Sequence, residues 1–154
     1  MKLYISLIIL LLFLSCNKKE NDRFNEEVRW IEQHIIDQIL TGYQIRETGI
    51  FIIHRYLSNQ DLSPSLNNNL EVVMDLTCLN AKNNSTYYHL EQDTLPIDDL
   101  INGLKIGLTH VSIGDSIQLY VPSRLAYGEE GLDTIPSNTI LKFDIYLSDI
   151  HPHF

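Results

Sequence analysis

Apolar and polar side chains alternate strictly near the C-terminal end of the chain, and few folds accommodate such a segment. Between Thr139 and Ile150, an apolar set (Leu141, Phe143, Ile145 and Leu147) alternates with a more polar set (Lys142, Asp144, Tyr146 and Ser148). Successive side chains of a strand point to opposite faces, so the pattern predicts a strand with one buried face. Such strands are typical of antiparallel sheets.

Other segments add to this sheet. Residues 50–56, 70–79 and 116–121 have the composition of strands, and the polar residues 80–85 predict a turn. Pro96 favours the start of a short helix. The apolar face of this helix would comprise Leu100, Ile101, Leu104 and Leu108. Several strands around one short helix predict an α+β fold.

A helical period precedes the strands. Apolar residues recur at spacings of three and four from residue 24 onwards: Phe24, Val28, Ile31, Ile35 and Ile39. This stripe predicts an amphipathic N-terminal helix over residues 24–42, with Gly42 closing its end. Three roles are open for the helix: docking on the domain, pairing with a second copy, or gathering substrate.

The first residues have the character of a targeting segment. The apolar run from Leu3 to Leu14 is too short to span a bilayer and suits a signal peptide. Ser15 and Cys16 follow it and resemble a bacterial lipobox, in which the cysteine receives fatty-acyl chains such as palmitate. We therefore expect a signal peptide over 1–15, a polar tether over 16–23 and lipid on Cys16. The alternative is a plain secretory signal that contains a cysteine.

Charge and composition exclude several functions. The chain has 20 Asp and Glu against 11 Lys and Arg, whereas nucleic-acid binding requires a basic surface. Its six histidines are scattered, and it contains neither a metal-binding motif nor a nucleophile motif, so we expect no metal and no cofactor. If Cys16 carries lipid, Cys78 has no disulfide partner and is expected to be a small buried side chain.

Motifs at characteristic spacings lie between Leu100 and Ile150. They are Leu-Ile-Asn-Gly-Leu-Lys-Ile-Gly at 100–107, Pro-Ser-Arg-Leu-Ala-Tyr-Gly at 122–128, Ile-Pro at 135–136 and Leu-Lys-Phe-Asp-Ile-Tyr-Leu at 141–147. Together they resemble the C-terminal half of an FKBP-type peptidyl-prolyl isomerase domain. The resemblance covers roughly residues 45–151. Within the family, the sequence also resembles divergent bacterial lipoprotein members linked to gliding motility. It implies an FKBP-like antiparallel sheet wrapped around a short helix.

The resemblance also implies a substrate pocket. In the family, the backbone N–H at the position of Ile101 holds a substrate carbonyl, and the hydroxyl at the position of Tyr127 donates to another. Phe143 matches the inward phenylalanine of the last strand. The remaining pocket residues by this resemblance are Leu100, Leu104, Ile135 and Tyr87. For all but Tyr87, the alternative is a plain role in the core.

The N-terminal half departs from the family. The resemblance places Asp75 where the family has a pocket tyrosine, and Tyr87 or Tyr88 where it has a phenylalanine followed by an aspartate that is absent here. Two functions are therefore open. One is an isomerase that desolvates an Xaa-Pro amide and assists folding of proline-containing exported proteins, lipid-anchored on the periplasmic side of a membrane, by expectation the outer membrane. The other is a catalytically impaired FKBP-fold binding module or chaperone.

Overall fold

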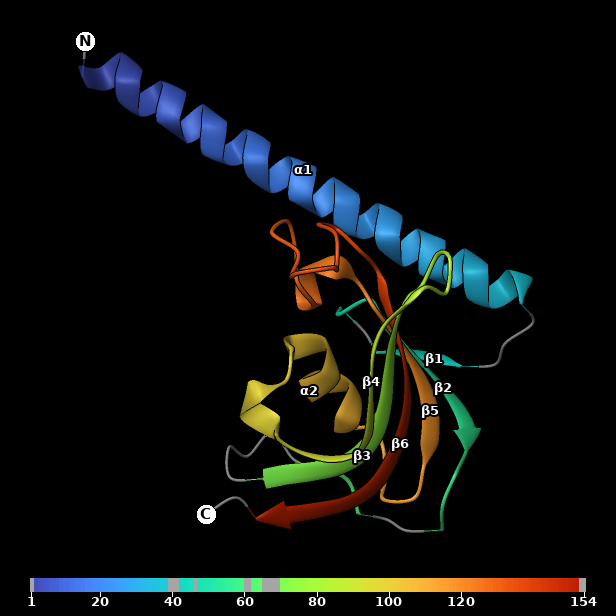
Figure 1. Cartoon of the computed structure of the whole chain (residues 1–154). Coiled ribbons are helices and arrows are strands. Elements are labelled where there is room, and N and C mark those ends of the chain that lie inside the picture. Colours follow the sequence, from blue (N-terminus) through green and yellow to red (C-terminus); the bar gives the residue numbers. More distant parts are fainter. Residues whose placement is uncertain (1, 39–41, 46, 60–61, 65–69, 153–154) are drawn as a thin grey trace.

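One antiparallel sheet carries a short helix on its inner face and a long N-terminal helix on its outer face (Figure 1). The computed structural model describes residues 2–38, 42–45, 47–59, 62–64 and 70–152, with only the backbone described for 2–17, Tyr43 and Leu70. The predicted α+β class is confirmed.

The sheet has the strand order β1-β2-β5-β6-β3-β4, and all neighbouring strands are antiparallel. Its strands are β1 (Tyr43–Ile45), β2 (Ile50–Tyr56), β3 (Leu70–Asn80), β4 (Thr86–Pro96), β5 (Ser116–Val121) and β6 (Leu141–Pro152). The bounds of β2 and β5 are the predicted ones, and β3 is one residue longer than predicted. β6 starts later than the predicted residue 139 and extends to 152.

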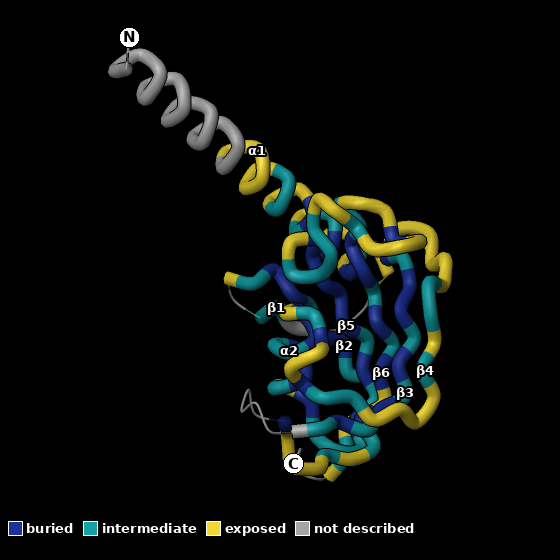
Figure 2. The backbone as a smooth tube through the Cα atoms, turned by 60° about the vertical axis from the view of Figure 1, so that its left-hand side comes forward, coloured by how far each residue is buried: buried dark blue, intermediate teal, exposed yellow. Residues whose placement is uncertain are grey.

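Two strands were not predicted from the sequence. β1 is only 3 residues long, and β4 lies at the other edge of the sheet. No residue of β4 is fully buried, so its sequence carries no clear alternation (Figure 2). An irregularity in its pairing with β3 also interrupts the strand, where Gln92 has a φ of 44°. Edge strands with such bulges lack the period on which prediction depends.

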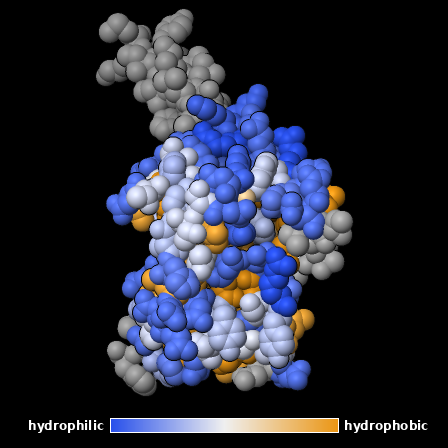
Figure 3. Space-filling model, turned by 45° about the vertical axis from the view of Figure 1, so that its right-hand side comes forward, coloured by the Kyte–Doolittle hydropathy of each residue, from blue (hydrophilic) through white to orange (hydrophobic). Residues whose placement is uncertain are grey.

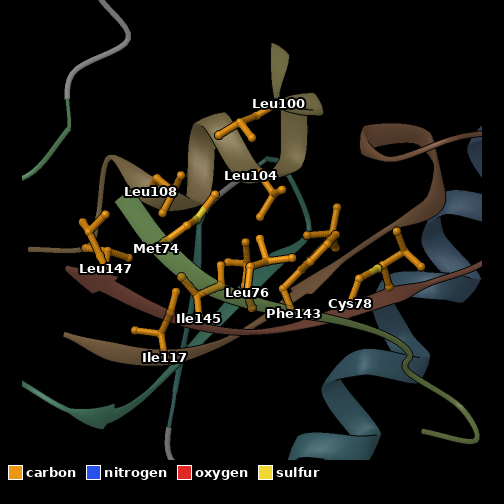
Figure 4. Close-up of a cluster of buried hydrophobic side chains, with 14 of the residues drawn as sticks. Met74, Leu76, Cys78, Leu100, Leu104, Leu108, Ile117, Phe143, Ile145 and Leu147 are labelled. Atoms are coloured by element: carbon orange, nitrogen blue, oxygen red, sulfur yellow. The ribbon is translucent and has the colours of Figure 1, made fainter. Parts of the chain in front are cut away.

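The inner face of the sheet packs against α2 (Asn102–Leu108). We expected one helix from Pro96, but the segment divides into a 3-10 turn, η1 (Ile97–Asp99), and α2, because Leu100 and Ile101 between them are extended. Figure 4 shows Leu100, Leu104 and Leu108 facing the side chains of the sheet. Gly107 permits this close approach, since a Cβ there would lie 2.6 Å from the Leu119 side chain.

The outer face of the sheet packs against α1 (Lys2–Asp37). The buried cluster between them comprises Ile31, Ile35, Ile53, Ala81, Tyr120 and Ile140. Gly49 has a φ of +71°, and a Cβ there would lie 2.4 Å from the Val28 side chain, so α1 lies directly against this turn. Of the roles open for the N-terminal helix, docking on the domain is the one that these contacts show.

The N-terminal segments differ in part from expectation. Residues 16–23, expected as a polar tether, are helical and continuous with the rest of α1, and they contain neither glycine nor proline to interrupt it. The helix expected to end at Gly42 ends at Asp37, while residues 39–41 and the side chains of 1–17, including Cys16, lie outside the described residues. Among the described helices, none is long and apolar enough to cross a membrane.

Hydrophilic side chains predominate on the face shown in Figure 3, where hydrophobic surface is confined to small areas. On the outward side of β6, Tyr146 is exposed, whereas the inward Ile145 and Leu147 are buried. The sheet beyond α1 is therefore largely solvated, as the alternation of β6 predicts.

Docking of α1 predicts a clear difference between two isoleucines of this helix. Ile31 is 0% exposed and Ile36 is 67% exposed. We expect Ile31→Ala to lower the free energy of unfolding by about 2–5 kcal/mol because it leaves a cavity. Ile36→Ala, the matched control, should change it by less than about 0.5 kcal/mol. Urea unfolding measures both, and equal changes would contradict the docking of α1.

Candidate functional site

The residues predicted for the pocket come together on the inner face of the sheet. Leu100, Leu104, Ile135 and Phe143 are buried in one core cluster, and Tyr87, Ile101 and Tyr127 are partly buried against it. They derive from β4, the η1–α2 segment, the loop before β6, and β6 itself. The fold therefore assembles residues that are distant in the sequence.

The floor of this candidate site is closed. Phe143 on β6 is 0% exposed and Leu104 on α2 is 3% exposed. Phe143 pairs with Leu119 of β5 and Cys78 of β3, which places it at the centre of the sheet (Figure 4). A ligand would therefore meet the partly exposed rim, which includes Ile101 and Tyr127, before it met Phe143.

Backbone hydrogen bonds hold Tyr127 from both sides. It follows the 3-10 turn η2 (Ser123–Leu125), and the Ser123 carbonyl accepts from the N–H groups of Ala126 and Gly128, each at 2.9 Å. Gly128 has a φ of 56°, a conformation that glycine adopts without strain. The carbonyl of Tyr127 itself accepts from the Gly131 N–H at 3.0 Å.

Ile101 directly precedes the first turn of α2, with a ψ of 153°. Amides at the start of a helix have no carbonyl partner within that helix. The Ile101 carbonyl already accepts from the Lys105 N–H at 3.1 Å, so the residue is fixed to α2 through its carbonyl. Ile101 is partly exposed and therefore lies at the rim, next to the helix that also supplies Leu104.

Tyr88, rather than Tyr87, meets Tyr127. Tyr88 pairs with Cys78 across β3 and β4, and burial, together with its hydrogen-bonded neighbours Cys78 and Tyr127, raises the pKa of the Tyr88 hydroxyl. The Tyr87 hydroxyl instead accepts from the Asn80 side-chain amide at 3.0 Å, near the β3–β4 turn. The β3–β4 pairing is irregular between Cys78 and Leu79, next to these two tyrosines, and both tyrosines pack against the core cluster.

Asp75 does not lie in the pocket, which corrects the expected alignment. Met74 and Leu76, its neighbours in β3, are buried on the inner face, so Asp75 points outward. Its carboxylate accepts from the Gln92 N–H at 2.6 Å and so supports the irregular part of β4. Successive residues of a strand point to opposite faces, so the Asp75 side chain cannot occupy the pocket position that the resemblance gave it. The inward positions of β3 are apolar.

Two other features of the described residues bear on where a ligand could bind. They include no group of three or more His, Cys, Asp and Glu that could hold a metal ion. A small cleft of about 110 Å³ lies between α1 and η2 rather than at the rim, and its walls include Arg23, Glu27 and Ser123.

Comparison with known proteins gives one consistent family. Residues 66–148 match the family model of FKBP-type peptidyl-prolyl cis-trans isomerase. The FKBP-type peptidyl-prolyl cis-trans isomerase FkpA of Escherichia coli (strain K12) is 37% identical over 68 residues, which are 44% of this chain and 25% of FkpA. FkpA of Buchnera aphidicola (subsp. Schizaphis graminum) is 41% identical over 66 residues, 43% of this chain and 26% of that protein. The chain thus spans about a quarter of the length of these relatives.

Solved structures share the fold. The crystal structure of FkpA from Escherichia coli superposes with a TM-score of 0.67 at 20% identity and covers 98% of this chain and 70% of that one. A peptidyl-prolyl cis-trans isomerase from Pseudomonas syringae pv. tomato superposes with a TM-score of 0.67 at 18% identity, covering 85% of this chain and 95% of that one.

The buried thiol at the floor predicts a loss of stability in alkali. Burial raises the pKa of the Cys78 thiol to about 11, whereas an unfolded cysteine has a pKa of about 8.5. The stabilisation from a neutral thiol is fully present below about pH 8.5 and is lost as the pH rises towards the folded pKa. Urea unfolding between pH 8 and 10 should show a steeper loss of stability in the unmodified chain than in Cys78→Ala. Equal slopes in the two proteins would contradict a buried neutral thiol.

Proposed function

Because the chain belongs to the FKBP-type peptidyl-prolyl cis-trans isomerase family, we propose that it catalyses cis–trans isomerisation of Xaa-Pro bonds in protein clients. The observation that carries the proposal is the convergence of Ile101, Tyr127 and Phe143 on one apolar cluster. Clients that are proline-containing, unfolded or newly exported fit such a role. The chemistry requires neither a cofactor nor a metal.

The reaction depends on environment rather than on a nucleophile. Rotation about the Xaa-Pro amide has a barrier of about 18–20 kcal/mol because resonance must be broken. Water favours the planar, charge-separated amide over the twisted and less polar transition state. An apolar surface that excludes water removes part of this preference, and so favours the transition state over the ground state.

Each rim residue has a defined part in this proposal. The Ile101 N–H and the Tyr127 hydroxyl donate hydrogen bonds to substrate carbonyls and orient the twisted amide. Leu104, Phe143 and Ile135 provide the apolar floor and wall. Tyr88 extends the rim beside Tyr127 and compensates in part for the absent aspartate, because its hydroxyl is a polar group at the same edge.

A second candidate function is a binding module or chaperone on the same scaffold. The observation that favours it is the closed floor, with Phe143 at 0% exposure, combined with the absent pocket carboxylate. Such a site would hold an apolar or proline-containing segment at the rim without twisting its amide.

The isomerase proposal is tested with a protease-free cis-to-trans assay on an Xaa-Pro peptide. We expect the chain to accelerate exchange and Tyr127→Phe to reduce kcat/KM by about tenfold, the effect of one transition-state hydrogen bond. Phe143→Leu should also reduce it. It is preferred to Phe143→Ala, because truncation to alanine at a buried phenylalanine costs about 3–5 kcal/mol of stability.

Asp75→Ala is the matched control, because it removes a carboxylate from the outer face of β3, the face away from the site. It should leave kcat/KM within about twofold, whereas Tyr127→Phe should not. If the folded chain gives no acceleration, the isomerase proposal is wrong. Suppression of client aggregation that Tyr127→Phe and Phe143→Leu abolish would then support the binding module.

The location of the chain is a further part of the proposal. The apolar run before Ser15 and Cys16 supports export and lipid attachment at Cys16, with the domain on the periplasmic side of a membrane, by preference the outer one. The net charge is −9, so the acyl chains rather than overall attraction to anionic lipid would supply the attachment.

Lipid attachment predicts a specific effect of Cys16→Ser in a bacterial host. The unmodified chain should incorporate radiolabelled palmitate and sediment with membranes. Cys16→Ser should lose the label and leave the membrane fraction, whereas Cys78→Ser should retain the label. A labelled Cys16→Ser variant would show that the acyl group is elsewhere.

A further inference from the structure

A buried carboxylate of α1 contacts the segment that precedes Tyr127, and Figure 1 shows α1 passing over this part of the chain. Glu27 is 7% exposed and Ser123 is 4% exposed. One Glu27 oxygen accepts from the Ser123 N–H at 2.7 Å, and the other accepts from the Ser123 hydroxyl at 2.6 Å. A buried charge is costly unless it is hydrogen-bonded, so this pair fixes the position of Ser123 against α1.

Ser123 in turn binds the backbone on both sides of Tyr127. Its carbonyl accepts from Ala126 and Gly128, the residues on either side of Tyr127. Pro122, the residue before η2, provides no side-chain cap. The Glu27 carboxylate therefore supplies the acceptor for the first amide of η2, the role that a capping side chain usually has.

Arg23 binds the loop that follows Gly128. Its guanidinium donates to the Glu129 carboxylate and, at 2.6 Å, to the side-chain oxygen of Asn138. The Asn138 N–H in turn donates to the Gly128 carbonyl at 2.7 Å. The two ends of the loop that contains Ile135 are therefore both attached to α1.

The geometry points to Glu27 as a positioning residue for the site: it holds Ser123, and through Ser123 the backbone at Ala126 and Gly128, so that the Tyr127 hydroxyl faces the substrate. This inference rests on the proposed isomerase function. It assigns α1 a part in the site although none of its residues belongs to the pocket. Glu27 acts only through Tyr127, so it does not touch the reacting amide.

The first test compares Glu27→Ala with Glu26→Ala in the full chain. Glu26 is the exposed neighbour, and its substitution changes the net charge by the same amount. We expect Glu27→Ala to lower kcat/KM by about tenfold, since small displacements of an orienting group have effects of this size. Glu26→Ala should stay within about twofold, and Glu27→Gln, which retains one acceptor oxygen, should lie between them. Equal activity in Glu27→Ala and Glu26→Ala would overturn the inference.

A second test separates positioning from general destabilisation. In a Tyr127→Phe background the hydroxyl is absent, so Glu27→Ala should cause no further loss of kcat/KM. A merely structural role would reduce the activity again, and multiplied losses would overturn the inference. If Glu27→Ala does not fold, the same cycle is run with Glu27→Gln and with Ser123→Ala, which removes the hydroxyl donor alone.

A third test does not depend on activity. Amide hydrogen exchange at Ala126 and Gly128 should be at least about tenfold faster in Glu27→Ala than in the unmodified chain, while exchange at Leu119 and Phe143 stays unchanged. If the unmodified chain is inactive, the proposed function is wrong. Faster exchange at Ala126 and Gly128 in Glu27→Ala would still show that Glu27 fixes the backbone around Tyr127. Unchanged exchange at Ala126 and Gly128 would overturn it whatever the activity.

Discussion

The rest of the structure depends on one property of β6: one of its faces is apolar and buried, and the other is more polar and partly exposed. Inward residues such as Phe143 and Leu147 are fully buried, whereas the outward Tyr146 is exposed. Burial of the inward row requires a cover, which α2 provides, and the adjacent outer surface at Tyr120 receives α1. A slip of one residue in β6 would exchange its two faces and expose the inward row that α2 covers. Phe143, the floor of the candidate site, belongs to this inward row.

Periodicity explains which elements could be predicted. β2 and β5 were predicted with their observed bounds because buried apolar residues fall at alternate positions, at Ile50 and Ile52 in β2 and at Ile117, Leu119 and Val121 in β5. β4 was missed because an edge strand without buried residues has no period to detect. The site was predictable to the same extent: Leu104 and Phe143 belong to regular elements with a clear apolar face. Asp75 and the choice between Tyr87 and Tyr88 depend on irregular pairing between β3 and β4, which depends on tertiary contacts that no local pattern in the sequence reveals.

Two buried carboxylate side chains have the same structural role. Glu27 binds the N–H and hydroxyl of Ser123, and Asp115, 3% exposed, accepts from the N–H groups of Ser58 and Ser112. Each carboxylate joins segments that are distant in the sequence, and each satisfies amides that a loop would otherwise leave without a partner. Neither could be distinguished from a solvated surface acid in the sequence, because burial of a charge depends on the partners that the fold brings to it.

The catalytic proposal and the support of Tyr127 by α1 are connected by the nature of the reaction. A site that acts by excluding water and aiming donors depends on the position of each donor. In this proposal the Tyr127 hydroxyl is one of only two donors, the other being the Ile101 N–H, so its orientation matters for the reaction. The hydrogen bonds from Glu27 through Ser123 to Ala126 and Gly128 place that orientation under the control of α1. The N-terminal helix is therefore better understood as a structural part of the site than as a spacer before the domain.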